Sequence, residues 1–267
     1  MNKYTSIFKI SLSQEFAYKL NFIMWRLRNV LQIVIFFSLW TAIFYFNNNN
    51  TVLGYSYEKI VAYSFMLIVV RSIVLSNRII DISGHIANGD LTNYLLRPIN
   101  YFKYWITRDL SSKFLNLSFS AIEITVLFLI IRPNLYIQTD PVRLLLFVVA
   151  LCVAVFMYFN ILMITNCVPF WTPELNWGAM FLVNMFVEFL SGSAFPLDVF
   201  PEVVTKIIKL TPFPYLIYTP IKAYLGQDSL MVTARDLVFG LVWSVVLYLI
   251  MKKVWNRGLK LYEGVGK

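Results

Sequence analysis

The stretch LLLFVVALCVAVFMYFNILMITNCV, residues 144–168, decides the fold. It contains no charged residue and is long enough to cross a bilayer, because a membrane-spanning helix needs about 20 mostly apolar residues. Five further apolar runs lie at residues 30–46, 60–75, 114–131, 178–195 and 237–254. These runs lack the alternation of polar and apolar residues that strands of a membrane β-barrel have. The sequence therefore predicts an all-α integral membrane protein with about six transmembrane helices.

The composition of the chain supports the same class. Of its 267 residues, 59% are hydrophobic and only 14% are charged, whereas a soluble domain is about half apolar and a quarter charged. The mean hydropathy is +0.67. Aromatic residues make up 17% of the chain, which suits a protein with two membrane–water interfaces. The low charge content argues against a soluble enzyme.

Lys and Arg residues fall in the gaps between the apolar runs. Five precede residue 30, five lie in 76–113 and five in 252–267, whereas the gaps 51–59, 132–143 and 206–235 hold one, two and four. Because positive charge favours the cytoplasmic side, both termini are expected in the cytoplasm. The net charge of +9 does not predict nucleic-acid binding, since the basic residues are not gathered on one soluble face.

The sequence lacks the enzymatic motifs that could be recognised by spacing. It has no Gly-x-x-x-x-Gly-Lys-Ser/Thr phosphate loop, no Gly-x-Ser-x-Gly elbow and no His-Glu-x-x-His helix. The one histidine, His85, has no evident catalytic partner, and Cys152 and Cys167 share an apolar run where packing is their expected role. We therefore predict no catalytic, cofactor-binding or metal-binding residue in this chain.

We expect a single transmembrane domain with seven parts. They are a cytoplasmic or interfacial helix at 1–29, spans 1–2 within 30–75, a cytoplasmic loop at 76–113, spans 3–5 within 114–195, an external re-entrant region at 196–236, span 6 at 237–254 and a cytoplasmic tail at 255–267. The first part is predicted to be amphipathic, because apolar residues recur every fourth position at Phe8, Leu12, Phe16, Leu20 and Met24. The alternative is an ordinary helix packed on its own protein.

The most informative loop reads DISGHIANGDLTNYLLRP, residues 81–98. Asp90 is a plausible N-cap for a short helix that ends before Pro98. On that helix Leu91, Tyr94 and Leu95 would share one apolar face, which must be buried against something. It packs either on the protein's own helix ends or on a partner protein.

The external region carries five prolines, at positions 196, 201, 212, 214 and 220. These prolines predict short broken helices rather than a continuous span, with Pro201 opening one of them. Such helices are tolerated at membrane depth where protein covers the backbone.

Two carboxylates lie inside apolar runs, Glu123 and Glu188. A charge at mid-bilayer costs roughly 2.5–3.5 kcal/mol on insertion scales, so such residues usually face the interior of a bundle or a cavity. They could contact a cationic substrate or act in gating, or they could be structural partners of Asn, Tyr or Ser on neighbouring helices. Asn184 is a comparable, weaker candidate for a substrate pathway.

Three segments carry a resemblance to a known family. ISGHIANGDLTNYLLRPINYFKYWITRDL (82–110) resembles the cytoplasmic connection of a branch of ABC-2-type transporter permeases. FPLDVFPEVVTKIIKLTPFPYLIYTPIKAYLG (195–226) resembles the external re-entrant region of that branch, and WNRGLKLYEGVGK (255–267) is similar to its cytoplasmic ending. The three segments occur in the expected order and cover essentially the whole chain.

The resemblance implies an export permease in the bacterial cytoplasmic membrane. It implies six spans, an N-terminal elbow helix, a coupling helix in the second connection and a dimer with an identical or sister permease. Two separate ATPase subunits would hold ATP and Mg²⁺, and the cargo would be a hydrophobic, amphipathic or cationic compound such as a drug, a peptide or a lipid. The expected ATPase contact lies in the loop 81–98 and consists of Gly84, His85, Ile86, Gly89, Asp90, Leu91, Tyr94 and Leu95. The connection 169–177 is expected to form a second ATPase contact.

Two other functions stay open. A non-transporting membrane scaffold or immunity factor could use a docking helix equally well. An integral-membrane enzyme that modifies lipids would need clustered Asp or His residues at a membrane face, and the 14 acidic residues are scattered.

Overall fold

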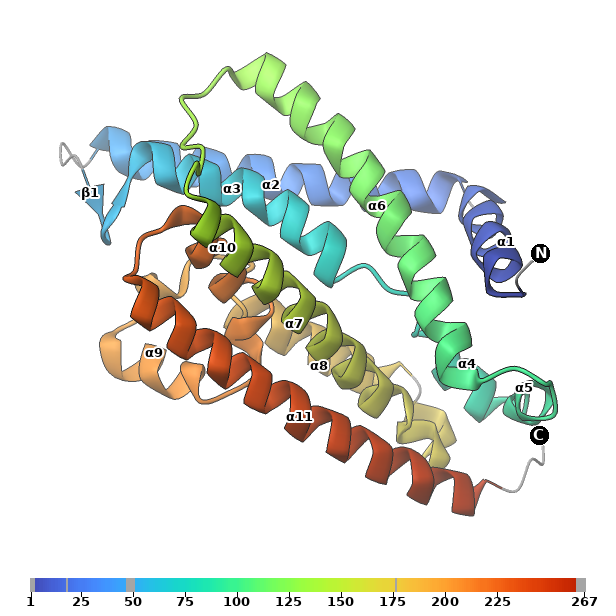
Figure 1. Cartoon of the computed structure of the whole chain (residues 1–267). Helices are drawn as coiled ribbons and strands as arrows, with labels where there is room; N and C mark the ends of the chain where they lie inside the picture. The colour runs from blue at the N-terminus through green and yellow to red at the C-terminus, as the bar shows by residue number, and fades with distance from the viewer. Residues whose placement is uncertain (1–2, 18, 47–50, 176, 263–267) are drawn as a thin grey trace.

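The computed structural model describes residues 3–17, 19–46, 51–175 and 177–262 (Figure 1). The side chains of residues 15–17, 19, 21 and 22 are not part of this description, so Phe16 of the amphipathic repeat lies outside it, as do the last five residues of the predicted tail. Strands in the described part are limited to one short antiparallel pair, β1 (Thr51–Val52) with β2 (Tyr55–Ser56).

Four long helices in the described part are long and apolar enough to cross a membrane. They are formed by α2 (Lys19–Phe46), α6 (Tyr101–Ile131), α7 (Pro141–Asn166) with the short helix that follows it, and α11 (Leu230–Leu261). The helix α7 packs along α11, and it begins with Pro141 after Asp140, whose carboxylate accepts a hydrogen bond from the backbone N–H of Val142 at 2.9 Å. The predicted all-α membrane class is confirmed.

The other two predicted spans differ from these four. The helix α3 (Tyr57–Val74) has 18 residues, contains Glu58, Lys59 and Arg71, and is enclosed by α2, α6, α7 and α10 (Tyr218–Leu225). The helix α8 (Gly178–Leu190) has 13 residues, about 20 Å at 1.5 Å per residue, which is shorter than the hydrocarbon core. The prediction that 60–75 and 178–195 are full spans is therefore not confirmed.

The helix α8 ends earlier than its apolar sequence suggests because the chain turns at Gly192. This residue has φ = 85°, and a Cβ there would lie 2.9 Å from both Tyr218 Cβ and the Tyr63 hydroxyl. The Tyr63 hydroxyl donates to the carbonyl of Gly192 at 2.6 Å, and the N–H of Tyr218 donates to the carbonyl of Ser191 at 2.8 Å. These contacts hold the turn against α3 and α10, so the fifth run stops at Leu190.

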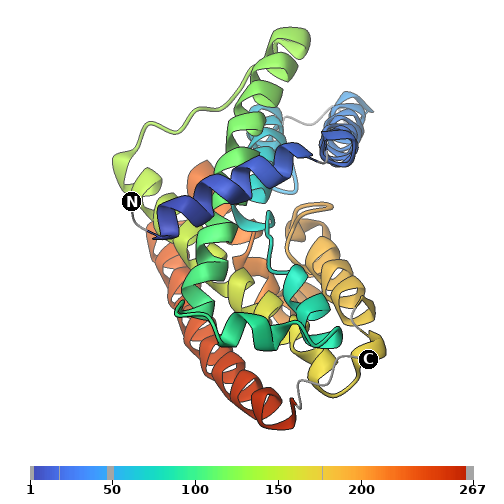
Figure 2. The same cartoon turned by 90° about the vertical axis from the view of Figure 1, so that its right-hand side faces the viewer.

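The N-terminal region forms two helices, and the second of them begins before the predicted boundary at residue 29. The helix α1 (Lys3–Ala17) crosses α6 (Figure 2), while α2 already begins at Lys19 and continues into the first span. The ring of Phe8 lies 6.1 Å from that of Phe114, and Ser11 is buried. The helix α1 is thus packed on its own protein, and its place at a membrane interface stays a prediction.

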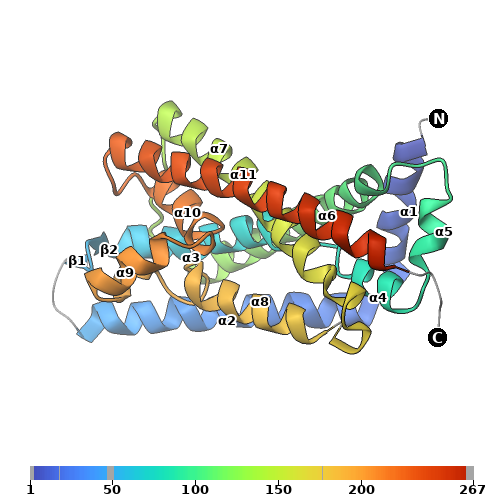
Figure 3. The ribbon, with the colours of Figure 1, turned by 90° about the horizontal axis from the view of Figure 1, so that it is seen from below.

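Short helices gather at the two ends of the bundle (Figures 1 and 3). The end that holds α1 and the last turn of α11, here called the terminal end, also holds α4 (Asp81–Ala87), α5 (Leu91–Leu95), η1 (Val168–Phe170) and η2 (Pro173–Leu175). The opposite end, here called the hairpin end, holds the β1–β2 pair, η3 (Leu197–Val199), α9 (Glu202–Lys209), η4 (Phe213–Tyr215) and α10. At the terminal end, Lys3 Nζ donates to the carbonyl of Pro98 at 3.0 Å.

The hairpin end is held by a polar cluster around Asp198. Its carboxylate accepts hydrogen bonds from the Tyr55 hydroxyl at 2.6 Å and the Tyr218 hydroxyl at 2.8 Å, and Lys222 lies 3.4 Å away. Pro201 precedes α9, as the proline pattern predicted. The helix α11 begins at Leu230, within the predicted external region 196–236, whose membrane boundary stays a prediction.

Candidate functional site

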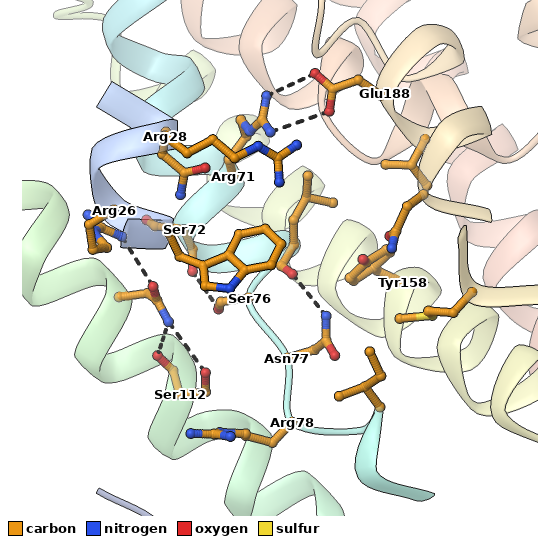
Figure 4. Close-up of a pocket in the computed structure, with 18 of the residues that line it drawn as sticks. Arg26, Arg28, Arg71, Ser72, Ser76, Asn77, Arg78, Ser112, Tyr158 and Glu188 are labelled. Atoms are coloured by element: carbon orange, nitrogen blue, oxygen red, sulfur yellow. Dashed lines mark hydrogen bonds and ion pairs between the residues drawn. The ribbon is translucent and has the colours of Figure 1, made fainter. Parts of the chain in front are cut away.

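A cavity of about 910 Å³ lies between α2, α3, α6 and α8 (Figure 4). Glu123, Glu188 and Asn184, which the sequence singled out as candidates for a substrate pathway, all line it. Tyr158 of α7 also lines the cavity. The structure therefore brings together three residues that are up to 65 positions apart in the sequence.

Glu123 of α6 is bound by Arg26 of α2. The Nε of Arg26 donates to one carboxylate oxygen of Glu123 at 2.6 Å, and its Nη2 donates to the other oxygen. The same guanidinium donates to Asn116 at 3.1 Å and to Ser120 at 3.3 Å. Only 10% of the Arg26 side chain and 13% of the Glu123 side chain are exposed. Arg26 and Glu123 therefore form a bidentate ion pair between α2 and α6, a geometry that gives strong charge-assisted hydrogen bonds.

Glu188 of α8 is bound by Arg71 of α3 (Figure 4). The two guanidinium nitrogens of Arg71 lie 3.2 and 3.3 Å from the two carboxylate oxygens. Arg71 also donates to the hydroxyl of Ser193 at 2.7 Å, and Gln32 of α2 donates to Glu188. This group therefore ties α8 to both α3 and α2 across the cavity.

Both carboxylates already have arginine partners, so neither presents a free negative charge to a cation. The sequence predicts Asn, Tyr or Ser as their structural partners, whereas the structure pairs them with Arg26 and Arg71. The sequence does carry a signal that these arginines need partners, since both lie in or beside apolar runs where a lone charge is costly. Which arginine meets which carboxylate could not be deduced from spacing.

At the terminal end, the predicted ATPase-contact residues form α4, a turn and α5. His85 stacks on Tyr94 with ring centroids 4.5 Å apart, and the ring of Trp105 in α6 lies 5.5 Å from His85. Ile86 and Leu91 are buried. Burial lowers the pKa of His85 below its ordinary value of 6.5, with Arg108 lowering it further and Asp81 and Asp90 opposing the shift.

Aromatic contacts beside this loop join α11 to α6 and to η1. The ring of Trp255 in α11 lies 5.2 Å from Tyr101 of α6 and 5.7 Å from Phe170 of η1. Gly258 lies so close to η1 that a Cβ would be 2.2 Å from Phe170 Cδ2. The helix α4 itself packs against η1 and η2, so the part of the connection 169–177 that these two short helices form lies beside α4. We call this set of contacts the aromatic junction.

Several details of the predicted helix are corrected. Asp90 precedes α5 but its side chain makes no capping hydrogen bond. Leu91 is buried whereas Leu95 is 45% exposed, so the predicted single apolar face is divided between the protein interior and the surface. Leu96, which sequence reasoning passed over, is 81% exposed.

The two glycines of the loop differ in what the structure requires of them. Gly89 has φ = 81°, a conformation that favours glycine at the turn. Gly84 has open space where a Cβ would be. Their role in an ATPase contact stays a prediction.

Comparison with known proteins agrees with this architecture. A model of the family described as "ABC-2 family transporter protein" matches residues 22–266, which include the four long helices, the cavity and the aromatic junction. A search of curated proteins finds no match. The match extends over nearly the entire chain, and the chain has the helices of a multi-pass membrane protein. The chain belongs to the ABC-2 transporter family, as a permease component.

Proposed function

We propose that this chain is the membrane half of an exporter in the bacterial cytoplasmic membrane, driven by two separate ATPase subunits docked at its terminal end. A second permease, identical or a sister chain, would complete the complex, and ATP and Mg²⁺ would be held by the ATPases. The Lys and Arg distribution supports a cytoplasmic position for the terminal end, because both terminal regions and the loop 76–113 are the basic segments.

The observation that carries this proposal is the division of α5 into an anchored side and an exposed side. Leu91 is buried, and Tyr94 is held by its stacking on His85. Leu95 and Leu96 are 45% and 81% exposed, and α5 lies at the terminal end of the bundle. A partner that binds these leucines would push on an element that is firmly connected to the rest of the protein.

The aromatic junction provides a continuous series of side-chain contacts through which a movement of α5 could be transmitted. From Tyr94 and His85 the contacts continue to Trp105 in α6, and from Tyr101 in α6 to Trp255 in α11. Arg108 of α6 adds an ion pair with Asp81 of α4 at 3.3 Å. Because α6 also carries Glu123 into the cavity, a movement of α5 would reach the cavity through one helix.

The test is co-purification of an ATPase subunit from detergent-solubilised membranes of the native host. Leu96→Asp is the informative variant, because its side chain is exposed and the change does not disturb the core. Leu91 is unsuitable, since a buried charge there would unfold the loop. Leu53→Asp is the matched control, because Leu53 is 48% exposed in the turn between β1 and β2 at the hairpin end.

We expect a protein with a Gly-x-x-x-x-Gly-Lys-Ser/Thr motif and ATPase activity to co-purify with the wild type and with Leu53→Asp. Leu96→Asp should lose most of it while eluting normally in gel filtration. Equal capture by both variants would contradict docking on α5. If no ATPase is captured by any form, the exporter proposal fails and the scaffold function becomes the better explanation.

A further inference from the structure

Two of the arginines that line the cavity, Arg26 and Arg71, are paired with carboxylates that also line it. Four arginines and three acidic residues line it. Glu123 is paired with Arg26 and Glu188 with Arg71, while Asp81 is 3.3 Å from Arg108, which is not among the lining residues. Among the residues that the structure describes, Arg28 has no ion pair, and its guanidinium lies 5.0 Å from the ring of Trp25.

Arg28 is suited to binding an anion. Its guanidinium presents several N–H donors in a planar fork that matches phosphate and carboxylate oxygens. Figure 4 shows Arg28 beside the cavity, on the same helix as Arg26. Since the three acidic groups are neutralised, an anion near Arg28 would meet no uncompensated negative charge from them.

The opposite wall of the cavity is apolar and accessible. Phe181, Met185 and Phe189 of α8 line the cavity, yet they are also 71%, 52% and 48% exposed. The cavity therefore opens to the surface along α8. In a membrane this surface is covered by lipid, so a molecule with an apolar body could enter from the side.

The side chain of Arg28 is exposed, and its position along α2 agrees with a headgroup position. It is the sixth residue of the candidate span Ile23–Phe46, so it lies about 8 Å from the start of that span at 1.5 Å per residue. Arginine at this depth can reach the headgroup level of a bilayer while its stem stays among apolar groups.

We propose that the cavity binds an anionic amphiphile, with a phosphate or carboxylate head on Arg28 and an apolar body against the exposed side chains of α8. As a substrate assignment this rests on the proposed exporter function, although the binding itself does not. It replaces the cationic cargo that the family resemblance allowed, because both carboxylates that could attract a cation are occupied by Arg26 and Arg71.

The test uses the full chain purified in a neutral detergent and titrated with phospholipids whose acyl chains carry bromine, which quenches tryptophan fluorescence on contact. Trp25 and Trp177 both line the cavity and serve as reporters. Brominated phosphatidylglycerol, with a net negative head, is compared with brominated phosphatidylcholine, whose head is neutral overall. Inorganic phosphate is added as a competitor, to separate an amphiphile site from a site for a free anion.

The variant is Arg28→Gln, and its matched control is Arg257→Gln. Arg257 is exposed near the terminal end of α11 and does not line the cavity. A second pair of changes, Trp25→Phe with Trp177→Phe, should remove the part of the quenching that depends on the headgroup. Gel filtration and circular dichroism would verify that each variant is folded.

We expect saturable quenching by phosphatidylglycerol at a concentration about tenfold below that needed for phosphatidylcholine, since a charge-assisted contact typically contributes that much. The preference should disappear in Arg28→Gln and persist in Arg257→Gln, and inorganic phosphate should not displace the lipid. Equal quenching by both lipids, an unchanged Arg28→Gln variant, equal loss in Arg257→Gln, or displacement by inorganic phosphate would each overturn the proposal.

The two proposals can fail separately. If the ATPase co-purifies but the lipid preference is absent, only the substrate class is wrong. If the preference is found but no ATPase is captured, the cavity binds the amphiphile in a protein that is not an exporter.

Discussion

Replacing Glu123 by glutamine would leave the guanidinium of Arg26 inside the bundle without its carboxylate. Both side chains are nearly buried, and they are joined by two hydrogen bonds from Arg26 to the two oxygens of Glu123. The reverse change, Arg26→Gln, leaves the carboxylate of Glu123 in the same position without a cation. The two variants are expected to differ, because the remaining partners of each charge differ.

Removing one member of a buried ion pair typically costs about 3–5 kcal/mol, because the other charge is left unpaired. Arg26 would keep its bonds to Asn116 at 3.1 Å and to Ser120 at 3.3 Å, so we expect Glu123→Gln to cost roughly 2–3 kcal/mol, below that range. Glu123 has no second partner among the described residues, so Arg26→Gln should cost about 3–5 kcal/mol. The double variant removes both charges and should recover at least half of the larger loss.

The assay is thermal unfolding of the purified full chain in detergent, followed by intrinsic tryptophan fluorescence. At about 2–4 °C per kcal/mol for a chain of this size, the two single variants should lower Tm by roughly 4–12 °C and 6–20 °C. Glu202→Gln is the matched control. Glu202 pairs with Lys206 at 2.7 Å, but both side chains are largely exposed, so its loss should leave Tm unchanged.

Two results would refute this reasoning. If Glu123→Gln is as harmless as Glu202→Gln, the buried pair does not stabilise the fold. If the double variant is no more stable than Arg26→Gln, the loss comes from packing of the arginine stem and not from an unpaired charge.

Two further predictions concern the aromatic junction. Gly258→Ala should lower Tm, because overpacking against Phe170 costs about 1–3 kcal/mol. Gly84→Ala should raise Tm slightly, because a Cβ there meets open space in a helix and alanine stabilises a helix by about 0.5–1 kcal/mol relative to glycine. Equal Tm shifts of the two variants in thermal unfolding would contradict the close contact between Gly258 and Phe170. The pKa of His85 is lowered by burial, so its contribution to stability is complete above the unfolded pKa of about 6.5 and is lost as the pH falls through the lowered value. Tm should therefore fall more steeply between about pH 7 and pH 5 for the wild type than for His85→Gln, and parallel pH profiles would disprove it.

The apolar helices could be predicted because their signal is local. The run 144–168 appears as α7 within a few residues, and its start is explained by Asp140 and Pro141. The proline that opens α9 was also found correctly. Composition over about 20 residues and the conformational limits of proline are enough for such elements, whatever surrounds them.

The length of α8 was not predicted correctly, because the apolar run in the sequence carries no information about distant residues that end the helix. The sequence remains apolar up to residue 195, so a span of that length was expected. The helix ends at Leu190 because Tyr63 and Tyr218, which are distant in sequence, bind the carbonyls of the turn. The division of α5 has the same origin, since Leu91 is covered by the rest of the protein and Leu95 is not.

The sequence alone indicates a helical membrane protein of the ABC-2 kind, in which Glu123 and Glu188 need protection inside the bundle. How these two carboxylates are protected is seen only in the folded chain. Arg26 and Glu123 are 97 residues apart, and Arg71 and Glu188 are 117 apart, so their pairing follows from how α2, α3, α6 and α8 pack around the cavity. A charge in an apolar run indicates that it needs a partner, but the partner's identity depends on which helix faces meet.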